Sequence, residues 1–402
     1  MKRILFVDDE PEVLAGLRNA LYDRRRQWDM LFLTTGQDAL AALELEPFDL
    51  VVSDIRMNDM DGITLLNEVR RRHATTARLV LSGVTDRESV LRALPVAQQF
   101  LSKPCDSATL HAALDRVFSL QELIGDPAVH SLVGGLESLP SLPSTYGELM
   151  RAVEEPNTSL DDLAMIVESD AGLAGRVLQL ANSSFFTASR RTLSVRTAVS
   201  YLGVEILRAI TLVTHVFKDL EHIRPTLHSL ARLKDHSLQV ARLARRMATE
   251  PKRAELAFTA GLLHDVGMVI LAQRSLARFS RIDRIAAETG RAFHEAEREL
   301  GPPSHAEVGA FLLGTWGLPF DLVEVVAFHH TPGRVHEGGS LDVLAAVHVA
   351  DSFVHATDSG ASDPNATLDS EFLERSGHRA KLDAWWNIAI EEAASEPNAR
   401  GA

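Results

Sequence analysis

The stretch RILFVDDE, residues 3–10, places a short apolar run directly before three acidic residues. The run Arg3–Val7 has the length of a β-strand and is too short for a secretory signal. The apolar spacing that follows predicts a helix over Glu12–Tyr22. A strand followed by an amphipathic helix is the repeating unit of α/β domains, so this stretch predicts such a domain in the first part of the chain.

The same alternation continues to about residue 123. Five strands, each followed by a helix, predict a doubly wound five-stranded parallel sheet of the flavodoxin-like kind. The further strands are expected at Met30–Leu33, Leu50–Ser53, Arg78–Leu81 and Gln99–Leu101, and the further helices at Gln37–Leu45, Ile63–Arg72, Arg87–Leu94 and Ser107–Leu123.

Polar side chains stand where four of these strands end. Asp8 and Asp9 follow the first strand, Asp54 the third, Ser82 the fourth and Lys103 the fifth. Because the carboxyl ends of parallel strands share one edge of the sheet, we expect these groups to converge there. Carboxylate oxygens suit Mg²⁺, whereas a hydroxyl and an ammonium group suit the oxygens of a phosphoryl group.

This pattern resembles the receiver domain of two-component response regulators, over residues 1–123. The resemblance implies a cognate sensor histidine kinase as partner. Asn58 stands where many receivers have proline, a difference that we expect to touch no ligand. The roles implied by the resemblance are Asp54 as phosphoacceptor, Asp8, Asp9, Asp54 and the carbonyl of Arg56 as Mg²⁺ ligands, Ser82 and Lys103 as phosphoryl contacts, and Phe100 as the switch aromatic.

After this domain the strand patterns fade. Residues 124–142 are rich in Gly, Pro and Ser and are predicted to be a linker. Residues 143–356 carry apolar side chains at helical spacing almost throughout, which predicts an all-helical second domain. Residues 357–402 are predicted to form a loop and a C-terminal helical extension that contains Trp385 and Trp386.

The second domain resembles the HDOD domain, an all-α module related to HD-type metal phosphohydrolases. The resemblance rests on LPSLP at 139–143, LANSSFF at 180–186 and AVSYLG at 198–203. HD phosphohydrolases hold metal with a histidine, an adjacent His-Asp pair and a later aspartate, and two-metal members add further histidines. The counterparts here, in chain order, are His236, His264, Asp265, His305, His329, His330 and Asp351.

These seven residues lie on apolar helical stripes and should point inward, where polar groups need partners. We expect them to converge, and imidazole with carboxylate suits Zn, Mn or Fe. The alternative is that they are hydrogen-bonded core residues, because 16 histidines and 55 acids make adjacent pairs such as His294–Glu295 and His336–Glu337 unsurprising.

Two departures argue against hydrolysis by this domain. Related cyclic-dinucleotide phosphodiesterases of the HD-GYP group carry a lysine where this chain has Met268. Their Gly-Tyr-Pro motif is replaced here by HHTPGRVHEGGS, residues 329–340. We therefore favour a signalling or binding module that acts on a downstream protein or a small ligand, with enzyme chemistry limited to phosphoryl transfer at the receiver. The alternative is a metal-dependent phosphohydrolase for a nucleotide or cyclic dinucleotide.

Composition limits the partners and the cellular compartment that the protein is expected to have. The net charge of −14 argues against nucleic acid as the main partner. The single cysteine, Cys105, excludes an intramolecular disulfide and favours a reducing cytoplasm. We find no run of 18 apolar residues and expect no membrane span. The sequence leaves open whether the protein forms a homodimer.

Overall fold

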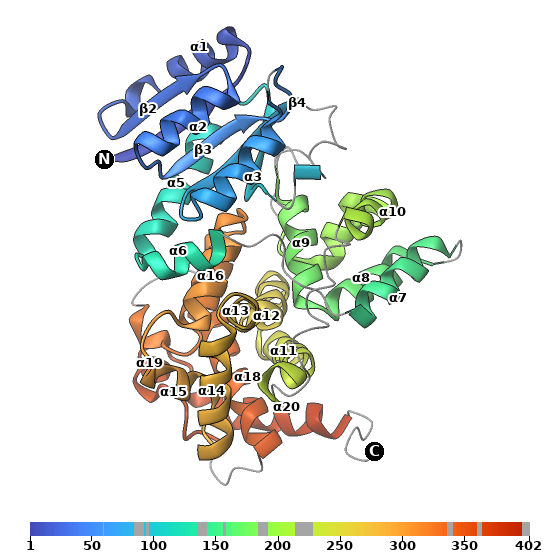
Figure 1. The fold of residues 1–402 in the computed structure, drawn as a ribbon. Coiled ribbons are helices and arrows are strands. Elements are labelled where there is room, and N and C mark those ends of the chain that lie inside the picture. Colours follow the sequence, from blue (N-terminus) through green and yellow to red (C-terminus); the bar gives the residue numbers. More distant parts are fainter. Residues whose placement is uncertain are drawn as a thin grey trace.

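The computed structural model describes residues 1–58, 60–83, 92–93, 96–134, 143–155, 158–183, 192–213, 228–335, 341–359 and 364–395. An α/β domain lies at one end and a larger helical domain at the other, with α6 (Pro127–Gly134) and α16 (His305–Thr315) near their boundary (Figure 1). The expected order of an α/β domain and a helical domain is confirmed.

The N-terminal domain contains a five-stranded parallel sheet in the order β2-β1-β3-β4-β5. The central strand β3 is buried along its whole length, as its apolar sequence requires in a sheet covered on both faces. All five predicted strands are confirmed, with slightly wider bounds. They are β1 (Lys2–Val7), β2 (Trp28–Leu33), β3 (Leu50–Asp54), β4 (Ala77–Gly83) and β5 (Gln99–Lys103).

Four of the five helices predicted for this domain are present, and most of the fifth, Arg87–Leu94, lies outside the described residues. Three of them begin after a side chain that accepts a hydrogen bond from the first turn, namely Thr35, Asp61 and Asp106. The helices are α1 (Pro11–Ala20), α2 (Gly36–Leu45), α3 (Gly62–Arg72) and α5 (Ser107–Leu123).

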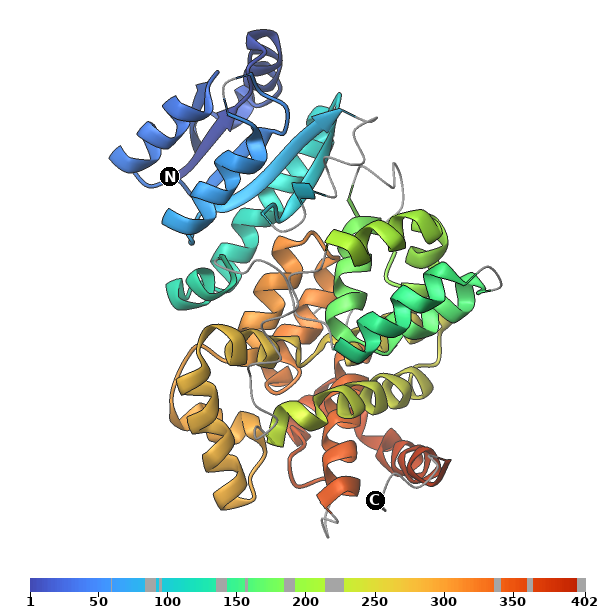
Figure 2. The same ribbon diagram turned by 45° about the vertical axis from the view of Figure 1, so that its right-hand side comes forward.

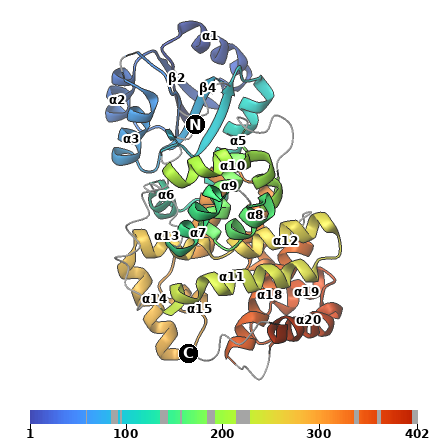
Figure 3. The same ribbon diagram turned by 90° about the vertical axis from the view of Figure 1, so that its right-hand side faces the viewer.

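The helical domain begins with a group of helices, α7 to α10, that stands beside the rest (Figures 2 and 3). Helix α11 crosses below this group and packs on α12 and α18. The helices are α7 (Pro143–Glu154), α8 (Leu160–Glu168), α9 (Ala171–Ala181), α10 (Val195–Val213), α11 (His228–Met247), α12 (Pro251–Leu263), α13 (Val266–Arg274), α14 (Leu276–Thr289), α15 (Phe293–Glu299), α16 (His305–Thr315), α17 (Phe320–Phe328), α18 (Leu341–Ser359), α19 (Ser370–Arg375) and α20 (Leu382–Ser395).

The segment predicted to be a linker contains a helix, α6 (Pro127–Gly134), which packs against α13 and α16. At the other end, Trp385 is buried, and Trp386 packs its ring against Phe353 of α18 at a centroid distance of 4.9 Å. The two tryptophans therefore dock the last helix onto the domain.

One helical stretch, Pro251–Arg274, is long and apolar enough to cross a membrane by composition alone. Of its most apolar window, 83% is buried inside the protein, as in the core of a globular domain. Burial within the fold accounts for its composition.

Candidate functional site

Lys103 joins two aspartates at the carboxyl edge of the sheet. Its Nζ lies 2.6 Å from Asp8 Oδ2 and 2.8 Å from Asp54 Oδ2. Burial raises the pKa of Asp8 despite the opposing effect of Lys103. Burial also acts to lower the pKa of Lys103, but its bonds to Asp54 and Asp8 outweigh this and hold that pKa above its usual value, so the ammonium group stays charged. We call Asp8, Asp9, Asp54 and Lys103 the carboxylate site.

Asp9 completes the carboxylate group and is held by Asn58. Ligand oxygens of Asp8, Asp9 and Asp54 all lie within 4.8 Å of one another, a spacing that a hard cation can bridge. Asp9 Oδ2 accepts hydrogen bonds from the backbone N–H of Asn58 at 3.1 Å and from its Nδ2 at 2.6 Å. The expectation that Asn58 touches no ligand residue is therefore wrong. A proline at this position would offer neither donor.

The three other residues predicted for this site lie around it. Ser82 is buried near the end of β4 and is the register partner of Ser102 on β5. Phe100 lies on β5 and is only 2% exposed, within the core. Arg56 is exposed in the loop that leaves β3. The sheet therefore gathers the predicted residues at one edge, with Phe100 beneath it.

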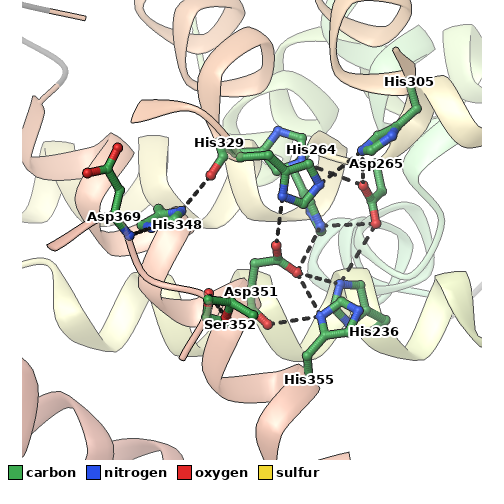
Figure 4. Close-up of polar contacts among 12 residues, drawn as sticks. His236, His264, Asp265, His305, His329, His348, Asp351, Ser352, His355 and Asp369 are labelled. Atoms are coloured by element: carbon green, nitrogen blue, oxygen red, sulfur yellow. Dashed lines mark hydrogen bonds and ion pairs between the residues drawn. The ribbon is translucent and has the colours of Figure 1, made fainter. Parts of the chain in front are cut away.

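The seven residues predicted to bind metal in the helical domain also come together, and Figure 4 shows six of them facing one another. We call these seven residues the histidine cluster. They come from separate parts of the fold: His236 from α11, His264 and Asp265 from the junction of α12 and α13, His305 from the start of α16, His329 and His330 from the end of α17, and Asp351 from α18.

The carboxylate of Asp265 lies between imidazoles on both sides. Its Oδ1 is 3.1 Å from His305 Nε2 and 3.7 Å from His329 Nε2. Its Oδ2 is 3.2 Å from His264 Nε2 and 3.8 Å from His236 Nε2. Asp265 could therefore bind a metal ion on either side, as a bridging carboxylate does.

Asp351 closes the cluster from α18. Its Oδ1 is 3.1 Å from His236 Nε2, and its Oδ2 is 3.4 Å from His330 Nδ1. The ligand atoms fall into two neighbouring sets, and within each set all of them lie within 4.8 Å of one another. One set is Asp265, His305, His329 and His330, and the other is His236, His264 and Asp351.

Backbone carbonyls orient two of the imidazoles toward the cluster. His264 Nδ1 lies 2.6 Å from the carbonyl oxygen of Gly261, and His329 Nδ1 lies 2.8 Å from that of Val326. A carbonyl only accepts, so each Nδ1 carries a proton, and each Nε2, which faces the cluster, is the nitrogen that a metal ion would take once it is free of a proton. This is the arrangement of metal-bound histidines, whose other ring nitrogen is held by a neighbouring acceptor.

Four buried ligand atoms of the cluster lack a hydrogen bond among the described residues: Nε2 of His236, His264 and His329, and Oδ1 of Asp265. All four lie close to groups of opposite type, but none in hydrogen-bond geometry. Buried polar atoms without hydrogen bonds are rare, and an ion is one of the ordinary reasons for them. A donor set of imidazole nitrogens and carboxylate oxygens fits Zn, Mn or Fe.

Burial and charge together set the protonation of the cluster. Burial acts to raise the pKa of Asp265, but His264 and its other imidazole partners outweigh this and hold it well below the usual value. Burial lowers the pKa of His330 well below the usual value, so this ring is neutral. His305 differs, because Glu297 and Asp265 overcome the effect of burial and raise its pKa to about 10. A metal at His305 would therefore take the place of a proton.

Glu297 on α15 is a residue of this site that the sequence did not reveal. It is only 3% exposed, and its Oε2 lies 2.8 Å from His305 Nδ1. Its Oε1 accepts the backbone N–H of His305, also at 2.8 Å. Because Glu297 belongs to a different helix, no spacing in the sequence connects it with His305.

Two further histidines border the cluster. His355 Nδ1 lies 3.1 Å from Asp351 Oδ1. It stands one helical turn after Asp351, a spacing that could have indicated it. The ring of His294 stacks on that of His330 at a centroid distance of 3.8 Å. The sequence predicted His294–Glu295 to be an adjacent pair that arises by chance, so it did not indicate this histidine, and His336–Glu337 lies outside the described residues.

A cavity of about 440 Å³ opens onto the cluster. His236, Asp265 and His305 form part of its wall, so a molecule in the cavity would touch the candidate ligands. Met268, which stands where the related phosphodiesterases have a lysine, also lines it. Arg232 and Arg291 add two cationic side chains to the lining.

Comparison with known families covers both domains. The response regulator receiver domain matches residues 4–115, and the HDOD domain matches residues 139–332. The chain is a response regulator with an HDOD domain. The receiver domain carries the carboxylate site, and the HDOD match includes every member of the histidine cluster except Asp351, which lies beyond its end.

Individual relatives match only part of the chain. An uncharacterized protein from Treponema pallidum is 27% identical over 203 residues, which are 50% of this chain and 39% of that protein. The transcriptional regulatory protein ZraR from Salmonella typhimurium is 31% identical over 169 residues, 42% of this chain and 35% of that protein. The chain thus spans little more than a third of the length of these curated relatives. A solved virulence factor from Campylobacter jejuni shares the fold over 68% of this chain and all of its own, with a TM-score of 0.50 and 21% identity.

Proposed function

We propose that this response regulator accepts a phosphoryl group on Asp54 and that the phosphorylation controls its HDOD domain. A receiver domain implies a cognate sensor kinase as the donor. The observation that supports Asp54 is its contact with Lys103 Nζ at 2.8 Å, because an ammonium group there can pair with phosphoryl oxygens. Mg²⁺ would be held by Asp8, Asp9, Asp54 and the carbonyl of Arg56, and it would neutralise charge on the transferring phosphoryl group.

For the HDOD domain we propose a centre for two transition-metal ions. One would be held by Asp265, His305, His329 and His330, the other by His236, His264 and Asp351. The observation that supports the centre is the set of four buried ligand atoms without a hydrogen bond. Ions of Zn, Mn or Fe in such a site stabilise a fold and can also lower the pKa of bound water.

The favoured role of this centre is to organise a signalling module that binds a downstream protein or a small ligand. Met268 supports this choice, because its thioether in the cavity wall offers a substrate phosphate no charge. Residues 329–340 support it as well, since they lack a Gly-Tyr-Pro sequence after the histidine pair.

A metal-dependent phosphohydrolase is the second candidate. It is favoured by the cavity, which brings the cluster residues His236, Asp265 and His305 into reach of a bound molecule. Arg232 in the same lining would pair with phosphate oxygens, and Arg291 would do so after leaving its ion pair with Glu299.

Elemental analysis of the full-length protein, purified without chelator, tests the centre directly. We expect close to two transition-metal ions per chain. The same protein is then assayed with bis-p-nitrophenyl phosphate. Bound metal without hydrolysis supports the binding module, and hydrolysis that His264→Ala removes supports the phosphohydrolase. Protein free of metal after supplementation would overturn the proposed centre.

We further propose that the working units are residues 1–123, 124–142, 143–356 and 357–402, as receiver, connector, HDOD domain and extension. We place the protein in the cytoplasm, with a homodimer as one form to be tested by light scattering. The charge of −14 and the single cysteine support a reducing compartment and a partner other than nucleic acid.

A further inference from the structure

Helix α16 begins in the histidine cluster and ends at the receiver domain. Its first residue is His305, whose Nε2 lies 3.1 Å from Asp265 Oδ1, and its last is Thr315. At 1.5 Å per residue the helix spans about 16 Å. One rigid element therefore reaches from the cluster to the boundary between the domains.

The far end of α16 is pressed against α5 of the receiver. A Cβ atom at Gly314 would overlap the side chain of Leu120, which is itself only 1% exposed. In the turn that follows α16, the carbonyl oxygen of Gly317 accepts a hydrogen bond from Arg116 Nη1 at 3.1 Å. The two helices are thus joined by close apolar packing and by a polar contact.

Strand β5 connects the same boundary with the carboxylate site. At its carboxyl end Lys103 contacts Asp54. Just before its amino end the carbonyl oxygen of Gln98 accepts a hydrogen bond from Gln179 Nε2 of α9 at 3.1 Å. The side chain of Gln99, the first residue of β5, lies beside the turn that follows α16. Strand β5 and helix α16 therefore form a continuous chain of contacts from the carboxylate site to the histidine cluster.

The end of α16 at the histidine cluster is packed equally closely against its neighbour, α13. A Cβ atom at Gly267 of α13 would overlap the carbonyl oxygen of His305, so the two helix backbones touch there. Asp265 immediately precedes α13. Because closely packed elements have no free space to take up a shift, a displacement of α16 would be shared by His305 and Asp265.

We propose that α16 couples the phosphorylation state of Asp54 to metal affinity at the histidine cluster. The inference rests on the proposed metal centre and adds the route of its regulation. A phosphoryl group on Asp54 brings charge and acceptor oxygens to Lys103, which must then leave or share its present partners. The resulting adjustment of β5 and α5 reaches α16 at Gly317 and Gly314. Linkage makes the effect reciprocal, so metal at the cluster changes the stability of the phosphorylated state by the same factor.

The test measures Zn²⁺ affinity of the full-length protein by competition with a chromophoric chelator. Both arms contain fluoride and a constant millimolar concentration of Mg²⁺, and one arm also contains beryllium, which forms a beryllofluoride analogue of the phosphoryl group. We expect the Zn²⁺ affinity to differ between the arms by about 5- to 150-fold. Arg116→Ala should reduce the difference to less than about twofold. Asp115→Ala is the matched control, because Asp115 neighbours Arg116 on α5 and pairs instead with Arg24.

Three outcomes overturn the inference in distinguishable ways. Equal Zn²⁺ affinity in both arms would overturn the coupling and leave the metal centre intact. A difference that Arg116→Ala and Leu120→Ala both leave unchanged would overturn the route through α16. Failure to bind Zn²⁺ in either arm would overturn the metal centre and the coupling with it. In the Asp54→Asn variant, beryllium should leave the Zn²⁺ affinity unchanged, which would identify Asp54 as the source of the effect.

Discussion

The carboxylate site and the histidine cluster solve the same problem, the concentration of ligand atoms, in opposite ways. The carboxylate site lies at the ends of strands, and two of its three aspartates contact one ammonium group. The histidine cluster lies among helices, and its two aspartates face five imidazoles. Oxygen ligands at a sheet edge suit Mg²⁺, which keeps several of its waters. Buried imidazoles suit a metal that stays.

The surroundings differ as much as the ligands. Asp9 is partly exposed and relies on Asn58, a loop residue, for its orientation. In the cluster His264 and His305 are at most 1% exposed, and both are oriented by groups on the helices themselves or next to them. We infer that the carboxylate site of the receiver serves transient chemistry and that the histidine cluster of the HDOD domain would hold its metal permanently.

Asp54→Asn tests the transient half of the comparison and has the largest expected effect. Labelling with radioactive acetyl phosphate should fall to background, because the amide cannot replace the carboxylate as acceptor. Asp61→Asn is the matched control, since asparagine also caps a helix and this residue only begins α3. The metal content of the HDOD domain should be the same in both variants. Equal labelling of the Asp54 and Asp61 variants would show that the phosphoacceptor lies elsewhere.

The double change His264→Ala with Asp265→Ala tests the permanent half. Each proposed set of ligands loses one member, and Asp265 also faces imidazoles of both sets, so elemental analysis should find the transition-metal content reduced to near zero. Labelling of Asp54 should persist. His111→Ala serves as the control, because this histidine lies on α5, bonded to the carbonyl oxygen of Ala20 and outside the cluster. Full metal content in the double variant would break the comparison, since the cluster would then be only a polar core.

Glu297→Gln sharpens the comparison by asking how far the surroundings set affinity. The amide can still accept the backbone N–H of His305 but no longer offers a charge to its ring. Second-shell changes of this kind cost about 10- to 100-fold in metal affinity, so a loss in that range is expected from Zn²⁺ competition measurements. Glu295→Gln on the same helix is the control, because its carboxylate accepts the N–H of Ala292 instead. An unchanged Zn²⁺ affinity would mean that the charge of Glu297 does not set the affinity of the cluster.

The two domains also differ in how much of each site can be predicted from the sequence. In the receiver, the strands have short apolar runs, and parallel pairing places their ends together, so topology alone brings Asp8, Asp54 and Lys103 into one site. The contact of Asn58 with Asp9 escaped prediction, because it depends on the path of a loop rather than on strand order.

In the HDOD domain, helical periodicity shows which residues point inward but not which helices meet. The set of seven was proposed from its order along the chain, through resemblance to a family. Glu297 and His294 could not be found in this way, because each reaches the cluster from α15, whose contact with α16 and α17 is set by tertiary packing. His355 was within reach, since it shares a helix face with Asp351 at a spacing of four residues.

Asn58→Ala has the smallest expected effect and tests whether the transient site depends on its loop. The change removes the side-chain donor to Asp9 at 2.6 Å and leaves the backbone donor at 3.1 Å. A hydrogen bond to a charged group contributes about 1.5–3 kcal/mol when fully formed and buried, and less at this exposed position, so a two- to tenfold rise in the Mg²⁺ concentration needed for half-maximal labelling is expected. Asn19→Ala, an exposed residue of α1, is the control and should leave that concentration unchanged. Asn58→Pro removes both donors and should exceed the alanine change. If proline instead matched the wild type, Asp9 would be oriented by Mg²⁺ alone, and the carboxylate site, unlike the histidine cluster, would not depend on the groups that surround its ligands.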